Sequence, residues 1–324
     1  MTAALIELRD VTKTFTVARK AGRLRRRLEH VRAVDDISFE IAQGAMVGYI
    51  GPNGAGKSTT IKMLTGILVP TSGRVRVAGL EPSRHRVELA RRIGVVFGQR
   101  TQLWWDLPLR DSFDLLRSIY RVPTARHAQN LAAFAALLDL GPLLEVPVRQ
   151  LSLGQRMRGE LTAALLHDPE ILYLDEPTIG LDVVSKAQVR EFLARLNRER
   201  GTTVLLTTHD LSDIERLCRR ILIIDMGHVI YDGDLPTIFR RFGDERTLVV
   251  DLEEPGPPID VPGAVVDRVE GPRQWLRFRG SELSASELVA RVAERVRLVD
   301  LAVEEADIED VVRHIYLTGR PDPP

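Results

Sequence analysis

The sequence has little cysteine and few aromatic residues: Cys218 is the only cysteine among 324 residues, and aromatic side chains make up 5%. A single cysteine excludes an internal disulfide and a cysteine-rich metal site, and it fits a reducing compartment. The sequence also lacks an apolar run of the ~18 to 20 residues that cross a bilayer, because two acids, a glycine and a proline interrupt residues 131–146. No basic leader precedes a long apolar segment at the start. We therefore expect a cytoplasmic chain that spans no membrane.

The sequence has no net charge, since 45 basic residues balance 45 acidic ones, but the charges are unevenly distributed. Residues 19–32 carry seven basic side chains against one glutamate, whereas residues 246–324 carry 16 acids against 10 arginines. The two ends of the chain are thus expected to meet different partners. An apolar content of 44% is typical of a folded chain, and the length favours one large domain with a small appendage.

The hydrophobic pattern predicts an α/β fold. Short continuous apolar runs, typical of buried parallel strands, lie at residues 46–50, 171–174, 203–207 and 221–224. Residues 111–166 have a mostly helical pattern with two interruptions, and alternating strands and helices imply a sheet covered by helices. After the turn-rich stretch EPGPPIDVPG, the pattern predicts strand, strand, helix, strand and helix. We interpret residues 246–320 as a small α+β domain.

A glycine-rich loop follows the apolar run at residues 46–50. GPNGAGKST matches G-x-x-x-x-G-K-[ST] in the strand-to-helix context that this motif requires. Its glycines let backbone N–H groups turn toward a phosphate, Lys57 reaches the β and γ oxygens, and Ser58 can ligate Mg²⁺. The sequence therefore predicts a nucleotide phosphate site formed by Gly51, Pro52, Asn53, Gly54, Ala55, Gly56, Lys57, Ser58 and Thr59.

Two acidic residues end the apolar run in ILYLDEP, where strand tips of α/β sheets present ligand groups. Asp175 is positioned to hold the Mg²⁺ water shell, and Glu176 to polarise an attacking water. An isolated Asp-Glu pair is more often a solvated turn. In a sequence that already contains a phosphate loop, the catalytic interpretation of this pair is favoured.

These segments, together with LSLGQ at residues 151–155 and TTHD around His209, resemble the ATP-binding cassette of ABC transporters. The resemblance covers residues 5–241. It implies a P-loop cassette with a mixed, largely parallel sheet, an antiparallel β subdomain and a helical subdomain at about residues 100–168. With the appendage, the expected division is a cassette at residues 1–241 and an accessory domain at residues 246–320.

The resemblance also implies roles for residues outside the phosphate loop. Glu176, His209 and Gln99 would form the catalytic group, with His209 at the γ-phosphate and Gln99 at Mg²⁺ beside Ser58 and Asp175. Further nucleotide contacts would come from Phe15, which would stack on adenine, and from Asp182, which would cross the dimer. The LSLGQ segment, called the signature segment, would complete the site of an opposite subunit through Ser152, Gly154 and Gln155. Leu153 and Gly180 depart from the usual pattern, which has glycine and alanine there, and we expect altered affinity rather than lost activity.

The function implied is an ATPase that uses ATP and Mg²⁺, pairs with a second cassette as a homodimer or paralogous heterodimer, and powers a separate integral-membrane permease from the inner face of the membrane. Short stretches, including QRTQLWWDLP, resemble type-2 exporters that move drugs or viologens. A non-transport ABC ATPase acting on ribosomes or DNA is the alternative, although such proteins carry two cassettes or long coiled coils. A small GTPase would need an N-K-x-D motif, which the sequence lacks.

Two further segments suggest surfaces for partners. Trp104 and Trp105 either dock on the membrane partner or belong to the core of the helical subdomain. The basic segment Arg19–Arg32 either contacts anionic lipid or forms a solvated loop. Because this segment has no aromatic residue for stacking, we expect no nucleic-acid partner.

Overall fold

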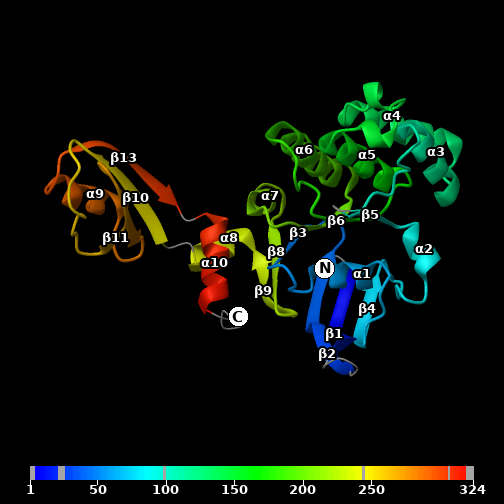
Figure 1. Cartoon of the computed structure of the whole chain (residues 1–324), viewed down its shortest axis with the longest axis horizontal. Coiled ribbons are helices and arrows are strands. Elements are labelled where there is room, and N and C mark those ends of the chain that lie inside the picture. Colours follow the sequence, from blue (N-terminus) through cyan, green and yellow to red (C-terminus); the bar gives the residue numbers. More distant parts are fainter. Residues whose placement is uncertain (1–3, 21–25, 98–99, 243–244, 306, 319–324) are drawn as a thin grey trace. The chain divides into compact units, whose positions relative to one another are not determined.

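A computed structural model describes residues 4–20, 26–97, 100–242, 245–305 and 307–318 (Figure 1). The chain forms two compact units, residues 1–232 and 233–324. None of the helices in the described part has the length and apolar character that crossing a bilayer requires.

A six-stranded sheet forms the centre of the first unit. Its strands run in the order β5-β6-β7-β3-β8-β9, and the neighbours from β5 to β8 are parallel. Every residue of β3 and β7 is buried, which explains why their sequences are continuous apolar runs rather than alternating ones. The bounds are β3 (Met46–Ile50), β5 (Ile93–Phe97), β6 (Ile171–Asp175), β7 (Thr203–Thr207), β8 (Arg220–Asp225) and β9 (His228–Asp234).

A three-stranded antiparallel sheet in the order β2-β1-β4 accompanies the central one. Its strands are β1 (Ala4–Lys20), β2 (Arg26–Ala42) and β4 (Ser72–Val77). One apolar core joins both sheets to the first helix, through buried residues such as Ile6, Ile41, Tyr49, Ile61 and Tyr173.

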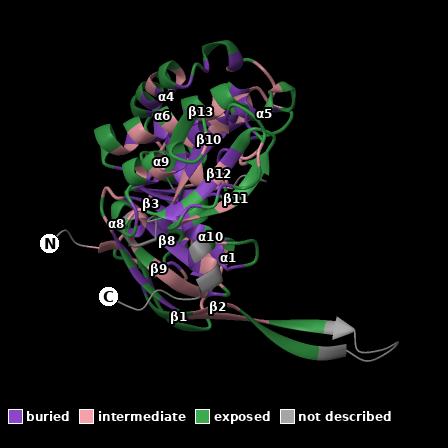
Figure 2. Ribbon diagram, turned by 90° about the vertical axis from the view of Figure 1, so that its left-hand side faces the viewer, coloured by how far each residue is buried: buried purple, intermediate pink, exposed green. Residues whose placement is uncertain are grey.

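The basic segment is not simply a solvated loop, since β1 and β2 stay paired as far as Lys20 and Arg26. Figure 2 shows the part of β1 and β2 that leaves the sheet as an arm coloured as exposed. Val17 and Leu28 on the arm are 42% and 64% exposed. Residues 21–25 lie outside the described part.

Helices cover the central sheet and form a separate helical group (Figure 1). The group contains α3 (Leu109–Tyr120), α4 (Thr124–Leu137) and α5 (Leu153–Leu165), with short 3-10 turns at Gly141–Leu143 and Val148–Gln150. These turns are the second of the two predicted interruptions, and Pro123 marks the first because proline cannot continue the preceding helix. The other helices are α1 (Lys57–Leu64), α2 (Arg86–Ala90), α6 (Val183–Arg200) and α7 (Leu211–Leu217).

The second unit is built on a four-stranded antiparallel sheet in the order β11-β12-β10-β13. Helix α9 contributes Leu288 and Val292 to a core shared with this sheet. The buried Gln274 amide fixes the proline-rich loop, accepting from the backbone N of Ile259 at 2.9 Å and donating to the carbonyl of Pro257 at 2.9 Å. The elements are α8 (Leu235–Phe242), β10 (Glu245–Leu252), β11 (Ala264–Glu270), β12 (Arg273–Arg279), α9 (Ala285–Ala293), β13 (Leu298–Glu305) and α10 (Ile308–Thr318). Both units confirm the predicted fold class.

Candidate functional site

The glycine-rich loop connects the end of β3 to the start of α1. Two of its glycines are required by close backbone packing. A Cβ on Gly51 would lie 2.3 Å from the carbonyl oxygen of Ile224, and one on Gly56 would lie 2.5 Å from that of Ala33. Gly56 also has φ of 113°, which side chains disfavour. The loop is thereby packed against β8 and β2.

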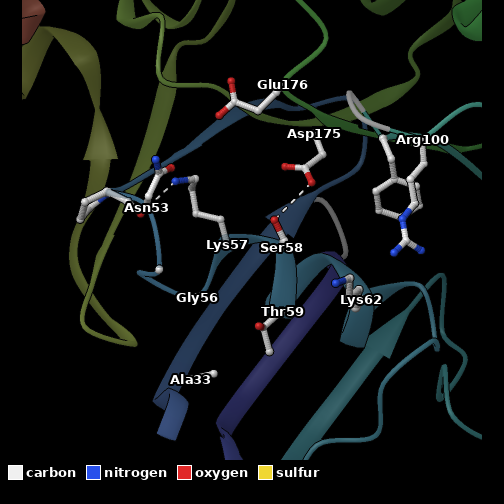
Figure 3. A pocket seen from close by; sticks show the side chains of 13 residues that line it. Ala33, Asn53, Gly56, Lys57, Ser58, Thr59, Lys62, Arg100, Asp175 and Glu176 are labelled. Carbon is white, nitrogen blue, oxygen red and sulfur yellow. Dashed lines mark hydrogen bonds between the residues drawn. The ribbon is translucent and has the colours of Figure 1, made fainter. Parts of the chain in front are cut away.

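Lys57 closes the loop on itself. Its ammonium donates to the carbonyl of Gly51 and, at 3.1 Å, to that of Pro52 (Figure 3). Burial lowers the pKa of Lys57, while the carboxylates of Glu176 and Asp175 act in the opposite direction. These hydrogen bonds hold the Lys57 side chain beside the loop, where a phosphate would meet it.

The loop borders a cavity of about 440 Å³ (Figure 3). The N-terminus of α1 opens onto it, so helix-start N–H groups and a positive dipole end favour an anion there. Three cations and two carboxylates share the lining, which comprises Ala33, Pro52, Asn53, Gly54, Gly56, Lys57, Ser58, Thr59, Lys62, Phe97, Arg100, Asp175 and Glu176. The cavity can therefore accept a polyanion, with carboxylates placed at one side of it.

Asp175 ends β6 and contacts the helix start. Its Oδ2 accepts from Ser58 Oγ at 3.2 Å, and its Oδ1 accepts from Thr207 Oγ1 at 2.6 Å. A hydroxyl and a carboxylate beside a phosphate site are the oxygen donors that Mg²⁺ prefers, since this ion commonly takes one or two protein ligands and completes its shell with water and phosphate. The residues present fit that ion.

Glu176 has a left-handed backbone, with φ of 58°. Its backbone N donates to the carbonyl of Thr207 at 2.9 Å, and its Oε2 accepts from His209 Nδ1 at 2.6 Å. A carboxylate accepts hydrogen bonds, so Nδ1 is the ring nitrogen that donates in this contact. The other ring nitrogen, Nε2, takes no part in it. Non-glycine residues with such backbones concentrate at functional sites. Glu176 and His209, which the resemblance places in one catalytic group with separate roles, are in contact.

The LSLGQ segment forms a separate group at the start of α5. Ser152 is the N-cap: its Oγ accepts from the backbone N of Gln155 at 3.2 Å, and Gln155 Oε1 accepts from the backbone N of Ser152 at 2.9 Å. A Cβ on Gly154 would lie 2.5 Å from Ser185 Oγ. Asp182, the N-cap of α6, accepts from that same serine. Among the described residues, the cavity lining includes none of this group.

The remaining predicted residues have different outcomes. Phe15 lies on β1 opposite Val31, with the Lys13 ammonium 5.2 Å from its ring centre, and it is not among the residues that line the cavity. Gln99 lies outside the described residues, although Phe97 and Arg100 on either side of it line the cavity.

Sequence reasoning missed Lys62 and Arg100. A signal for Lys62 was present, because it follows Ser58 by four residues and therefore shares its helix face. Trp104 and Trp105 are 38% and 47% exposed, so they do not belong to the core of the helical group.

Comparisons with known proteins agree with this geometry. Residues 34–179 match the family model described as ABC transporter. The chain is 35% identical over 291 residues to the Nod factor export ATP-binding protein I of Paraburkholderia xenovorans, which covers 89% of this chain and 92% of that protein. It is 32% identical over 241 residues to the methionine import ATP-binding protein MetN of Geobacillus kaustophilus, covering 73% and 68%.

A solved structure is also similar. It is the dimeric, post-hydrolysis state of the ATP-binding cassette MJ0796 bound to ADP and Pi, with 27% identity and a TM-score of 0.61. The similarity covers 71% of this chain and 98% of that chain.

Proposed function

Because this chain belongs to the ATP-binding subunits of ABC transporters, and is an ATPase, we propose that it powers export through a membrane permease formed by another chain. ABC cassettes dimerise and work with such permeases. The observation that supports export is a single match to an export protein that extends into the second unit. The match to the Nod factor export protein covers 89% of the chain and so extends into the second unit, whereas the match to the methionine import protein covers 73%.

The direction of transport can be tested on the complex that copurifies from membranes. The complex is reconstituted in vesicles with the cassettes outward, and radiolabelled methyl viologen or daunorubicin is supplied on either side. For an exporter, ATP added outside drives the probe into the lumen. ATP-driven movement from the lumen toward the cassette side would show import and refute the proposal.

We propose that the cavity binds the phosphates of ATP. The loop N–H groups and Lys57 would bind the β and γ oxygens, and Ser58 and Asp175, together with Gln99, would hold Mg²⁺. When bound, the ion neutralises phosphate charge. Glu176 accepts a proton from the attacking water, and its contact with His209 holds the carboxylate in position. The 2.6 Å contact between these two side chains supports this role.

We further propose that a second cassette completes the site. Ser152, Gly154 and Gln155 lie at the start of α5, outside the cavity lining described above. The capping box uses the N–H groups of Ser152 and Gln155, so the Gly154 N–H and the Ser152 hydroxyl proton are the donors we assign to a γ-phosphate held by another chain. Asp182, which caps α6 next to Gly154, would lie at the same interface. Phe15 is proposed as the adenine contact, because its register partner Val31 is two residues from cavity-lining Ala33.

A nucleotide site completed by two cassettes predicts a trapped dimer. Glu176→Gln spares binding but removes the proton acceptor, so ATP with Mg²⁺ should convert the chain, with its permease present, into a closed dimer measured by analytical ultracentrifugation. Ser152→Ala in the same background should weaken that dimer. Turnover of ATP by Glu176→Gln at the parental rate would remove Glu176 from the catalytic role.

The domain division is also proposed rather than fixed. We keep residues 1–241 as the cassette and 246–320 as the accessory domain, with anionic lipid contact at the arm of residues 19–32. The compact units divide slightly earlier, at residue 232, because α8 packs on α10. Truncation after residue 241 tests the division: a cassette that still hydrolyses ATP supports it.

A further inference from the structure

Glu160 is a buried carboxylate that none of the sequence motifs includes. It lies on α5 and is 5% exposed. Its Oε1 accepts from the hydroxyl of Thr101, and its Oε2 accepts from the backbone N of Gln102 at 3.2 Å. The side-chain amide of Gln102 donates in return to the carbonyl of Glu160 at 3.2 Å. Burial raises the pKa of Glu160, and the hydrogen bonds from Thr101 and Gln102 act in the opposite direction.

Neighbouring residues of α5 hold the same segment. The guanidinium of Arg156, one turn before Glu160, lies 5.5 Å from the centre of the Trp105 ring. A Cβ on Gly159 would lie 2.9 Å from Leu109 Cδ1 and 3.2 Å from Leu103 Cδ1, so both buried leucines pack closely against this glycine. Residues 101–105 are therefore attached to α5 by hydrogen bonds, a cation–π contact and close apolar packing.

The attached segment begins at the nucleotide cavity. Arg100 lines that cavity, and its backbone N donates to the carbonyl of Phe97 at the end of β5. At the other end lie the exposed Trp104 and Trp105. The helix that holds the segment starts at Ser152. Glu160 is thus the polar connection between the edge of the cavity and the helix whose start is proposed to face a second cassette.

We propose that Glu160 is a positioning residue that fixes Arg100–Leu103 on α5, so that the cavity edge, the tryptophan pair and the start of α5 move as one body. The proposal rests on the proposed function for the roles of Ser152 and the tryptophans. The attachment itself is a property of the free chain.

Two substitutions separate hydrogen bonding from packing. Glu160→Leu fills similar space but leaves the Gln102 N–H and the Thr101 hydroxyl without the acceptor, which is costly for buried groups. Glu160→Gln keeps the shape, and its amide can accept from Gln102 and donate to Thr101. Glu145→Leu is the matched control, because Glu145 lies in the same helical group and is 73% exposed in a surface ion pair.

The first measurement is hydrogen–deuterium exchange of the full chain without nucleotide, read by mass spectrometry on peptides covering residues 100–105. We expect Glu160→Leu to speed exchange there by at least about tenfold, the equivalent of leaving one buried donor without its acceptor. Glu160→Gln and Glu145→Leu should exchange like the parent. Unchanged exchange in Glu160→Leu would overturn the proposal.

The second measurement is steady-state ATP hydrolysis by the full chain, normalised to the number of sites counted with a fluorescent ATP analogue. The loop that binds phosphate does not touch Glu160, so KM should stay within about twofold while kcat falls ~10- to 100-fold through misplacement of the cavity edge. Glu160→Gln should restore kcat. An unchanged kcat, or a loss explained by fewer binding sites, would overturn the positioning role.

The two measurements also separate this proposal from the function on which it rests. The exchange experiment needs no nucleotide. If residues 100–105 are protected in the parent chain but no nucleotide-loaded dimer forms, the proposed two-cassette site is refuted. The attachment by Glu160 then still stands.

Discussion

Gly154 offers a sharp test of why the signature segment contains glycine. A Cβ at this position would lie 2.5 Å from the Oγ and 3.0 Å from the Cβ of Ser185, well inside normal contact distance. Overpacking of this kind costs ~1 to 3 kcal/mol. The substitution Gly154→Ala also gains ~1 kcal/mol of helix propensity. We therefore expect a net destabilisation of up to ~2 kcal/mol.

Removing the side chain of Ser185 should restore the stability of Gly154→Ala. Ser185→Gly deletes both clashing atoms, and the backbone N of residue 185 can still donate to Asp182 Oδ1, a bond of 2.9 Å. Alone, this change costs roughly 0.5 kcal/mol of helix propensity. It also removes the 2.7 Å hydrogen bond that the Ser185 hydroxyl donates to Asp182 Oδ2, worth ~1 kcal/mol. Combined with Gly154→Ala, it should show a favourable coupling of ~1 to 3 kcal/mol, the overpacking that it relieves.

The assay is a double-mutant cycle on urea unfolding of the cassette, with ATP hydrolysis measured on the same samples. Because alanine retains the backbone N–H that we assign to the γ-phosphate, the double variant should hydrolyse ATP near the parental rate. Additive stability changes, with no coupling, would show that contact with Ser185 is not the reason for the glycine. Restored stability without restored hydrolysis would show that glycine at position 154 is required for the dimer interface instead.

Three further predictions follow from burial. The hydroxyl of Tyr173 is buried and has no hydrogen-bond partner among the described residues, so Tyr173→Phe should raise the free energy of unfolding by about 1 kcal/mol. Tyr49→Phe, which loses a 3.1 Å bond to a threonine of α1, should lower it by about as much, and urea titrations of the two variants check both signs. Replacing Trp104 and Trp105 together by alanine should reduce transport but spare basal ATPase, because both rings are half-exposed; equal losses would argue against docking. Burial raises the pKa of the Cys218 thiol, so Ellman's reagent should react with it only after unfolding, and rapid reaction of the native chain would contradict its burial.

The phosphate site was predictable because its information is local. GPNGAGKST lies between a strand and a helix, and those two elements alone place Lys57 and Ser58. The contact of Ser58 with Asp175 joins residues 117 positions apart. It was still predictable, because parallel strands of one sheet end at the same edge. The proximity of Glu176 and His209 followed from the same rule applied to β6 and β7.

Other features depend on packing that a single sequence does not display. Glu160 has no motif around it, and its burial becomes evident only when residues 101–102 fold against α5. The length of the β1–β2 hairpin was not predicted, because the run of basic residues hides the alternation of apolar and polar residues that marks a strand. In the structure, β1 and β2 continue to pair as far as Lys20 and Arg26. The clash that requires Gly154 involves Ser185, on a different helix.

The capping box at Ser152 bears on whether a helix cap can also bind ATP. Its hydroxyl accepts from the backbone N of Gln155. A serine hydroxyl has two acceptor lone pairs and one proton, so capping leaves the proton free to be donated. The box uses the N–H groups of Ser152 and Gln155, and it leaves those of Leu153 and Gly154 as the helix-start donors. A leucine at position 153 supplies such a donor as well as glycine does, and its side chain lies toward Gly180, where a Cβ would be 2.9 Å away. Capping therefore leaves the hydroxyl proton and both N–H groups free for the phosphate contact proposed above, so capping does not compete with the role that we propose for Ser152.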